Sequence, residues 1–174
     1  MAVAIKNSGF KNITLYNGGL KDWIKAGNEV TAVAPLPAIN VKFVDVDELQ
    51  KLLAAADKQN CRDADNNPLL TILDFRMSRA LQKKMSADKY QIQTRCRTIN
   101  AQLDAFIDNK KLIDSLPENG QIIAISETGN RDRFLIQFLS QYNKTNIRGL
   151  KYGMRNWLKA GYSVEKIPEK PVTN

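Results

Sequence analysis

The sequence of 174 residues contains no histidine and only two cysteines, Cys61 and Cys96. Without histidine there is no Ser-His-Asp or Cys-His pair, no imidazole metal ligand and no imidazole acid or base, so most hydrolase mechanisms are excluded. The two cysteines lie far apart and show no CxxC spacing. This pattern indicates neither a zinc site nor a dithiol redox pair, and it gives no support to a disulfide framework. We expect no metal site and no cofactor.

Long apolar runs and charge clusters are also missing. No stretch is long enough to span a bilayer, and the N-terminus has neither the basic start nor the apolar core of a secretory signal, so cytoplasm and periplasm both stay open. Lys and Arg exceed Asp and Glu by 26 − 18 = 8. This excess is spread along the chain rather than clustered with aromatic residues, which favours a basic solvated surface over nucleic-acid binding. We expect neither a nucleic-acid nor a membrane partner.

What the chain does contain is a repeat. Residues 12–27, NITLYNGGLKDWIKAG, resemble residues 146–161, NIRGLKYGMRNWLKAG, without a gap and at a constant offset of 146 − 12 = 134. Trp23 and Trp157 coincide, as do the glycines on either side of them. We interpret this as a duplicated unit whose first copy has lost its front, so that the chain starts within a unit. Two unrelated amphipathic helices, each ended by a glycine, are the alternative.

Hydrophobic periodicity predicts alternating strands and helices. Asp47 is expected to cap a helix, the chain after Val164 is expected to be loose, and Pro35 and Pro37 suggest a linker. The alternation implies a mainly parallel sheet with helices on both faces. The expected strands cover 12–16, 69–75, 97–101, 121–125 and 146–149, and the expected helices 19–26, 47–56, 77–87, 103–115, 132–142 and 153–160. The expected domains are a partial unit 1–34, a linker 35–40, a main domain 41–166 and a tail 167–174.

A six-residue loop, 126–131, follows the most apolar predicted strand, and ligands bind at the carboxyl ends of strands in parallel sheets. Gly129 allows a left-handed turn, and successive backbone N–H groups together with the positive end of the next helix would form a concave anion site. Arg131 could close this site from its rim. The alternative is a tight polar turn with no ligand. The candidate residues are Ser126, Glu127, Thr128, Gly129, Asn130 and Arg131.

The arrangement resembles the rhodanese (sulfurtransferase) family over residues 41–166. The segments that carry the resemblance are Leu73-Asp74-Phe75-Arg76 as the first core strand, Thr98-Ile99-Asn100-Ala101 as the Ala-Ile-Asn segment, the loop 126–131 as the active-site loop, and Gly153–Trp157 with Ala160–Tyr162 as the closing motifs. The resemblance implies a rhodanese-like three-layer α/β fold with a mainly parallel central sheet, and supporting roles for Asp74 and Arg76 near the loop. Residues 2–34 resemble the ending of a preceding domain, as in tandem rhodaneses.

In the family the loop begins with a cysteine whose thiolate carries a sulfane sulfur, but here that position is Ser126. An alcohol is scarcely ionised near pH 7 and does not form a stable persulfide, so Ser126 should not carry sulfur. Glu127 adds a negative charge beside the loop that arginines such as Arg131, Arg133 or Arg95 would have to compensate. Cys96 lies beside a predicted strand rather than in the loop, so we expect a structural cysteine and not a displaced nucleophile.

The resulting expectation is a catalytically silent rhodanese-like module that serves a neighbouring rhodanese-like domain as a structural or recognition partner. Its loop would keep an affinity for small anions such as thiosulfate or sulfate. The apolar residues of 2–34, Trp23 among them, should be buried by docking on the main domain or in a domain-swapped dimer. One alternative is a working sulfurtransferase in which Ser126 is an engineered replacement for cysteine or the active cysteine lies upstream. The other is an inactive phosphatase-like binder of anions or phosphoproteins.

Overall fold

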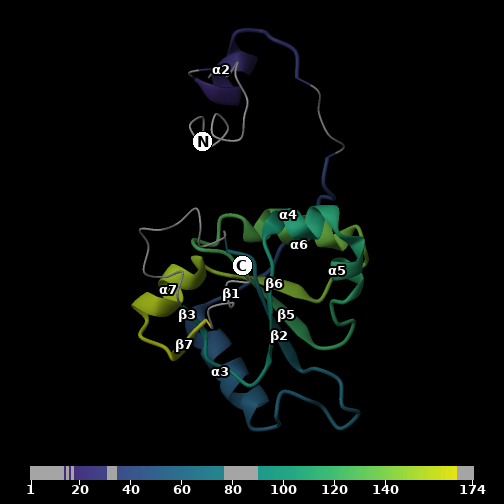
Figure 1. Cartoon of the computed structure of the whole chain (residues 1–174), viewed down its shortest axis with the longest axis vertical. Helices are drawn as coiled ribbons and strands as arrows, with labels where there is room; N and C mark the ends of the chain where they lie inside the picture. The colour runs from purple at the N-terminus through teal and green to yellow at the C-terminus, as the bar shows by residue number, and fades with distance from the viewer. Residues whose placement is uncertain (1–13, 15, 17, 31–34, 77–89, 168–174) are drawn as a thin grey trace, which may run out of the picture. The chain divides into compact units, whose positions relative to one another are not determined.

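The computed structural model describes residues 14, 16, 18–30, 35–76 and 90–167. The chain divides into two units, residues 1–35 and 36–174. The first unit contributes one described helix, α2 (Gly19–Lys25). The second contains, in order, β1 (Phe43–Val44), α3 (Val46–Asp57), β2 (Leu70–Asp74), β3 (Tyr90–Ile92), β4 (Arg97–Asn100), α4 (Leu103–Asp108), α5 (Lys110–Asp114), β5 (Gln121–Ile125), α6 (Asp132–Ser140), β6 (Ile147–Leu150), α7 (Gly153–Lys159) and β7 (Val164–Lys166) (Figure 1). The expected helix 77–87 and most of the expected strand 12–16 lie outside the described residues.

The second unit is built on a five-stranded sheet in the order β1-β6-β5-β2-β4, in which every pairing is parallel. Helices α4, α5 and α6 cover one face of this sheet, and α3 and α7 cover the other (Figure 1). Parallel strands inside a sheet are buried on both faces, which explains why the interior strand β2 is an unbroken buried run. The fold class predicted from the alternation of strands and helices is therefore confirmed.

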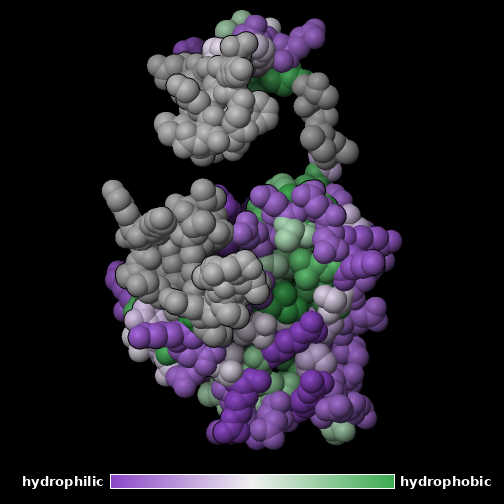
Figure 2. Space-filling model, viewed as in Figure 1, coloured by the Kyte–Doolittle hydropathy of each residue, from purple (hydrophilic) through white to green (hydrophobic). Residues whose placement is uncertain are grey.

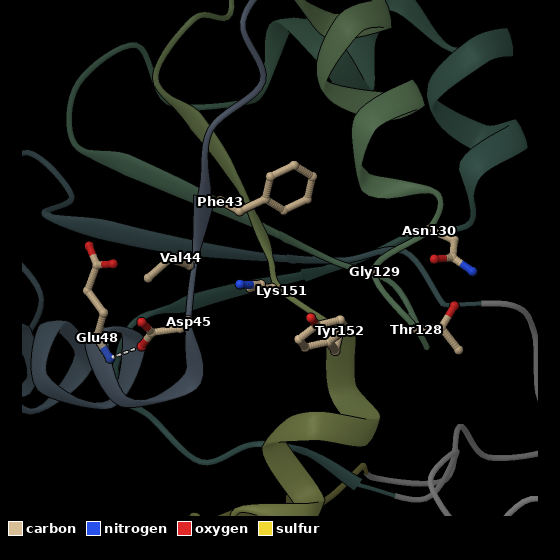
Figure 3. Close-up of a pocket in the computed structure, with 9 residues that line it drawn as sticks. All are labelled: Phe43, Val44, Asp45, Glu48, Thr128, Gly129, Asn130, Lys151 and Tyr152. Atoms are coloured by element: carbon tan, nitrogen blue, oxygen red, sulfur yellow. Dashed lines mark hydrogen bonds between the residues drawn. The ribbon is translucent and has the colours of Figure 1, made fainter.

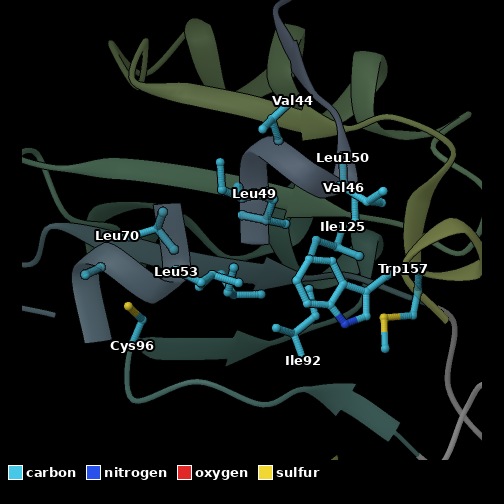
Figure 4. Packing of buried hydrophobic residues seen from close by; sticks show 14 of the residues in the cluster. Val44, Val46, Leu49, Leu53, Leu70, Ile92, Cys96, Ile125, Leu150 and Trp157 are labelled. Carbon is cyan, nitrogen blue, oxygen red and sulfur yellow. The ribbon is translucent and has the colours of Figure 1, made fainter. Parts of the chain in front are cut away.

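Two hydrophobic cores lie on opposite faces of the sheet, and β5 contributes to both. Its alternate side chains point to opposite sides, so that Ile123 and Ile125 join one core while Ile122 and Ala124 join the other. The first core gathers around Trp157, which is 1% exposed (Figure 4). On the face drawn in Figure 2, most of the coloured surface of this unit is hydrophilic, and hydrophobic residues reach the surface in smaller areas.

The start of α3 and the continuity of the expected helix 103–115 differ from the prediction for reasons that the side chains show. The cap of α3 is Asp45 and not Asp47, because the Asp45 carboxylate accepts a hydrogen bond of 2.8 Å from the Glu48 N–H. Asp47 instead accepts a hydrogen bond from the Tyr162 hydroxyl. The single helix expected over 103–115 is split into α4 and α5 at Asn109, whose extended backbone breaks the helix and whose side chain caps α5.

The residues directly after Val164 are ordered into a strand, contrary to the expected loose tail, whereas 168–174 lie outside the described residues. Residues Val164–Lys166 form β7, which pairs antiparallel with β3 in a small second sheet. The Gln91 amide adds a hydrogen bond of 2.6 Å to the Glu165 carboxylate. Such short strands carry little periodicity of their own, and their pairing depends on a partner more than seventy positions away.

The cysteine pattern gave no support to a disulfide, but Cys61 and Cys96 are joined by one. Cys61 follows α3, and Cys96 directly precedes β4. Their Cα atoms lie 5.0 Å apart, and both side chains are at most 5% exposed. The fold brings the segment after α3 beside the residue that precedes β4, and the sequence spacing gave no sign of this contact. The disulfide supports the view that Cys96 is structural.

Within the first unit the apolar residues of α2 are exposed, and their expected burial by docking or in a domain-swapped dimer stays a prediction. Helix α2 has no buried residue, and its large apolar side chains stay exposed: Leu20 at 67%, Trp23 at 39% and Ile24 at 52%. These side chains share one face of the helix at positions i, i+3 and i+4. Taken by itself, the first unit therefore carries exposed apolar side chains on one face of α2.

Candidate active-site loop

The loop 126–131 leaves the carboxyl end of the central strand β5 and leads into α6. The turn between β6 and α7 packs against it: the Met154 N–H donates to the Ser126 carbonyl at 3.0 Å, and the Arg155 N–H donates to the Glu127 carbonyl at 3.1 Å. Gly153 has φ 63°, and a Cβ at this position would lie 2.3 Å from the Ser126 oxygen. The closing Gly-Met motif is thus a support that fits under the loop only because residue 153 is glycine.

Ser126 is held at the base of the loop and is only 3% exposed. Its Oγ accepts a hydrogen bond of 3.0 Å from the Gly129 N–H, and its own N–H donates to Asp132 Oδ1 at 3.1 Å. Gly129 has φ 80°, the left-handed conformation that the sharp turn requires. The serine hydroxyl therefore holds the two ends of the turn together.

The charge on Glu127 is balanced by a residue that sequence reasoning missed. Its Oε1 lies 3.0 Å from Arg155 Nε in an ion pair, while Oε2 is buried without a hydrogen-bond partner among the described residues. Arg131 and Arg133 are exposed, and Arg95 donates to the Asn60 side chain. None of these three makes an ion pair within the described part of the chain. The proximity of Arg155 arises because α7 packs against the loop.

Asp132, the first residue of α6, is the second residue that the sequence did not reveal. It is fully buried beneath the loop. One carboxylate oxygen accepts the Ser126 N–H, and the other, Oδ2, has no partner among the described residues. Burial raises the pKa of Asp132 to about 6, although the polar groups of Ser126 and the nearby Leu150 backbone act in the opposite direction. An acidic residue in the first helical turn normally faces solvent near the helix dipole, so its type gave no sign of burial.

The two supporting residues lie at the end of β2, next to the loop-bearing strand β5 in the sheet. Asp74 and Arg76 form an ion pair of 2.7 Å, and both side chains are 6% exposed. Arg76 also donates to the Tyr90 carbonyl at 2.6 Å. Asp74 thus binds a neighbouring side chain, and the pair connects the end of β2 to β3.

A cavity of about 500 Å³ lies beside the loop, at the carboxyl ends of β1, β5 and β6 (Figure 3). Its charged groups have partners of their own: Asp45 caps α3, Glu48 pairs with Arg148 at 2.6 Å, and the Lys151 ammonium lies 5.5 Å from the centre of the Tyr152 ring. Thr128, Gly129 and Asn130 supply the loop side of the cavity, and the remaining lining residues are Phe43, Val44, Asp45, Glu48, Lys151 and Tyr152.

The loop has no cysteine, and both cysteines of the chain belong to the disulfide. Asp57 Oδ1 lies 3.2 Å from the Cys61 sulfur and 3.9 Å from the Cys96 sulfur. These three atoms are close enough to bind a metal ion together, but the two sulfurs are bonded to each other and are not thiolate ligands.

Among the described helices, none has both the length and the apolar character that a membrane span requires.

These features define an α/β protein with a parallel sheet and a strand–loop–helix segment at the carboxyl edge of that sheet. Solved structures specify it further. The rhodanese-like domain of an Anabaena protein is 17% identical, with 78% of this chain and 86% of that chain covered and a TM-score of 0.52. A Bacillus halodurans protein is 17% identical over 71% of this chain and 76% of that one, with a TM-score of 0.51. The chain therefore has a rhodanese-like fold.

A third solved structure has a similar fold, but its name suggests another activity. It is a Rhodopseudomonas palustris protein of unknown function, described as a possible tyrosine phosphatase, with 12% identity, 90% of this chain and all of that chain covered, and a TM-score of 0.50. No protein-family model and no curated protein matches the sequence. At these identities the likeness shows the fold alone.

Proposed function

We propose that this chain is a catalytically inactive rhodanese-like module that acts as a structural or recognition partner of a neighbouring rhodanese-like domain. The observation that carries the proposal is Ser126, which stands at the position of the family's sulfur-carrying cysteine and whose hydroxyl is already used inside the loop. Sulfur transfer needs a thiolate that attacks a sulfane sulfur and holds it as a persulfide. In its disulfide-bonded form the chain has no thiol at all.

The fold likeness to a possible tyrosine phosphatase does not favour phosphoryl chemistry. In the phosphatases that the loop spacing resembles, the nucleophile is also a cysteine at the first loop position. Ser126 has neither a thiolate nor a histidine to deprotonate it. The missing nucleophile counts equally against sulfur transfer and phosphoryl transfer, and an inactive phosphatase-like binder of anions or phosphoproteins stays the alternative.

The partner in this proposal is a second rhodanese-like domain, of which residues 1–34 are the closing part. The repeat supports this idea, because α2 and α7 begin and end at the same offset of 134 positions. Gly19 has φ 64°, like Gly153 with φ 63°. Gly153 needs this conformation to fit under Ser126, whereas a Cβ on Gly19 would meet nothing within 4 Å. Gly19 thus has the left-handed backbone conformation with which Gly153 packs against the loop 126–131, and this conformation would suit a corresponding loop in the other domain.

The direct test is a thiosulfate:cyanide assay of the purified chain, with and without a reducing agent. We expect no thiocyanate above the uncatalysed rate, because no thiol lies in the loop. Ser126→Cys places a thiol there, and Ser140→Cys, which adds a thiol on α6, is the matched control. Thiocyanate produced by the wild-type chain and abolished by Cys96→Ser would overturn the proposal.

A further inference from the structure

We propose that Asp132 makes the loop selective against anions, because its buried carboxylate places a negative charge directly beneath the backbone that an anion or a thiolate would need. This inference rests on the proposed function and deepens it, since it concerns the substrate class that the same loop accepts. It replaces the expectation that the loop binds thiosulfate or sulfate at neutral pH.

The Asp132 side chain points toward the loop from the interior of the protein. The residue is fully buried, and its Oδ1 takes the Ser126 N–H at 3.1 Å. On its other side, Gly149 of β6 comes so close that a Cβ there would lie 2.9 Å from the Asp132 Cβ. The carboxylate is thus held between the loop and the sheet. Its Oδ2 has no hydrogen-bond partner within the described parts of the chain, so the negative charge is incompletely balanced.

The electrostatic consequence follows from the position of Asp132 at the start of α6. A helix N-terminus attracts anions because the helix dipole is equivalent to roughly half a positive elementary charge there. A full negative charge on the first helical residue outweighs that dipole. Because Asp132 is buried, solvent screens its repulsion much less than it would at the surface.

The other charged groups around the loop do not restore an anion site. Glu127 is paired with Arg155, which leaves that pair close to neutral. Arg131 and Arg133 flank Asp132 in the sequence and are exposed, so water and salt weaken their effect. Lys151, which follows β6, lines the cavity and lies near the Tyr152 ring. Asp132 therefore contributes the charge that dominates under the loop.

The first experiment titrates sodium sulfate into the protein at pH 8 and follows loop amide signals by NMR. We expect no saturable binding for the wild type and at least about tenfold tighter binding for Asp132→Asn, which keeps the oxygen that accepts the Ser126 N–H and removes the charge. Asp108→Asn, an exposed change on α4, is the matched control and should resemble the wild type. Equal sulfate affinity in the wild type and Asp132→Asn would overturn the inference.

A titration of the unchanged protein covers the case in which Asp132→Asn fails to fold. Burial raises the pKa of Asp132 to about 6, so the carboxyl is mostly neutral at pH 5 and mostly charged at pH 8. We expect the wild type to bind sulfate at pH 5 and to lose this binding by pH 8. Sulfate affinity that is the same at both pH values would count against the role of Asp132.

The second experiment measures the ionisation of a thiol in the loop by its thiolate absorbance, which does not need access of a reagent. In Ser126→Cys with Asp132 in place, the thiol should titrate above the usual value of about 8.5. In the double variant with Asp132→Asn it should ionise about tenfold more readily. Identical titrations of the two proteins would overturn the inference.

The outcomes of the inference and of the proposed function can be told apart. If the wild-type chain proves to transfer sulfur, the proposed inactivity fails, and the sulfate titration still decides the role of Asp132. If the thiol titrations coincide while the wild-type chain stays inactive, the inference fails and the proposed function stands.

Discussion

Helices α2 and α7 have almost the same local structure and opposite surroundings. Both contain seven residues. In both, the tryptophan indole donates to the backbone carbonyl six positions later, from Trp23 to Glu29 at 2.9 Å and from Trp157 to Ser163 at 3.2 Å. Yet Trp157 is 1% exposed in the core and Trp23 is 39% exposed. The comparison teaches that the local sequence sets the shape of this motif, whereas its burial depends on the sheet beside it.

The largest expected effect contrasts the two tryptophans directly. Trp157→Ala should lower the free energy of unfolding by about 3–5 kcal/mol, because it removes a large side chain from a packed core. Trp23→Ala should change it by less than about 0.5 kcal/mol, because the side chain is partly exposed. Chemical denaturation followed by far-UV circular dichroism measures both values. Equal losses in the two variants would show that α2 is covered in solution.

The disulfide is a further difference between the two units, because both of its ends lie in the second one. Replacing both Cys61 and Cys96 by alanine should lower the free energy of unfolding by about 3–4 kcal/mol, since the unfolded chain loses a cross-link over 35 positions. Calorimetry with and without a reducing agent checks this value. The reducing agent should destabilise the wild type and leave the double variant unchanged. A wild type that does not respond would contradict the prediction.

Asp132→Asn should have a slightly smaller effect, of opposite sign and dependent on pH. The pKa of Asp132 is raised from 3.8 in the unfolded chain to about 6 in the folded one, mainly by burial. Below pH 3.8 the carboxyl is protonated in both states and has no cost. Between pH 3.8 and about 6 the unfolded carboxyl ionises while the folded one keeps its proton, so the wild type loses up to about 3 kcal/mol relative to the variant, and the full loss is present above pH 6. Denaturation at pH 4 and pH 8 measures this difference, and a gap that does not widen with pH would contradict the prediction.

Much of the second unit could be predicted because its strands and helices are long or strongly apolar. Strand β5 has the predicted bounds, and β2 lies within the predicted range. The short strands β1, β3 and β7 could not be predicted, since two or three residues show no periodicity and pair only with distant partners. The Asp45 cap was missed because Asp47, two positions later, is an equally good capping residue type.

The candidate loop was located from the sequence, but its electrostatics were not. Gly129 and the run from Ser126 to Arg131 were recognisable as a turn after a buried strand. The partners that decide its charge, Arg155 for Glu127 and the buried position of Asp132, depend on how α6 and α7 pack against the loop. A residue type shows that a group can carry charge, and only the fold shows what lies beside it.

The Cys61–Cys96 bond makes the middle of the second unit a covalent ring. Strands β2 and β3 both lie between its two ends. A protease cut anywhere between residues 61 and 96 therefore opens the ring without releasing a fragment. The nicked chain should migrate as one band on a non-reducing gel and as two bands after reduction. The two thiols set free in this way would be the first that the protein offers to an alkylating reagent.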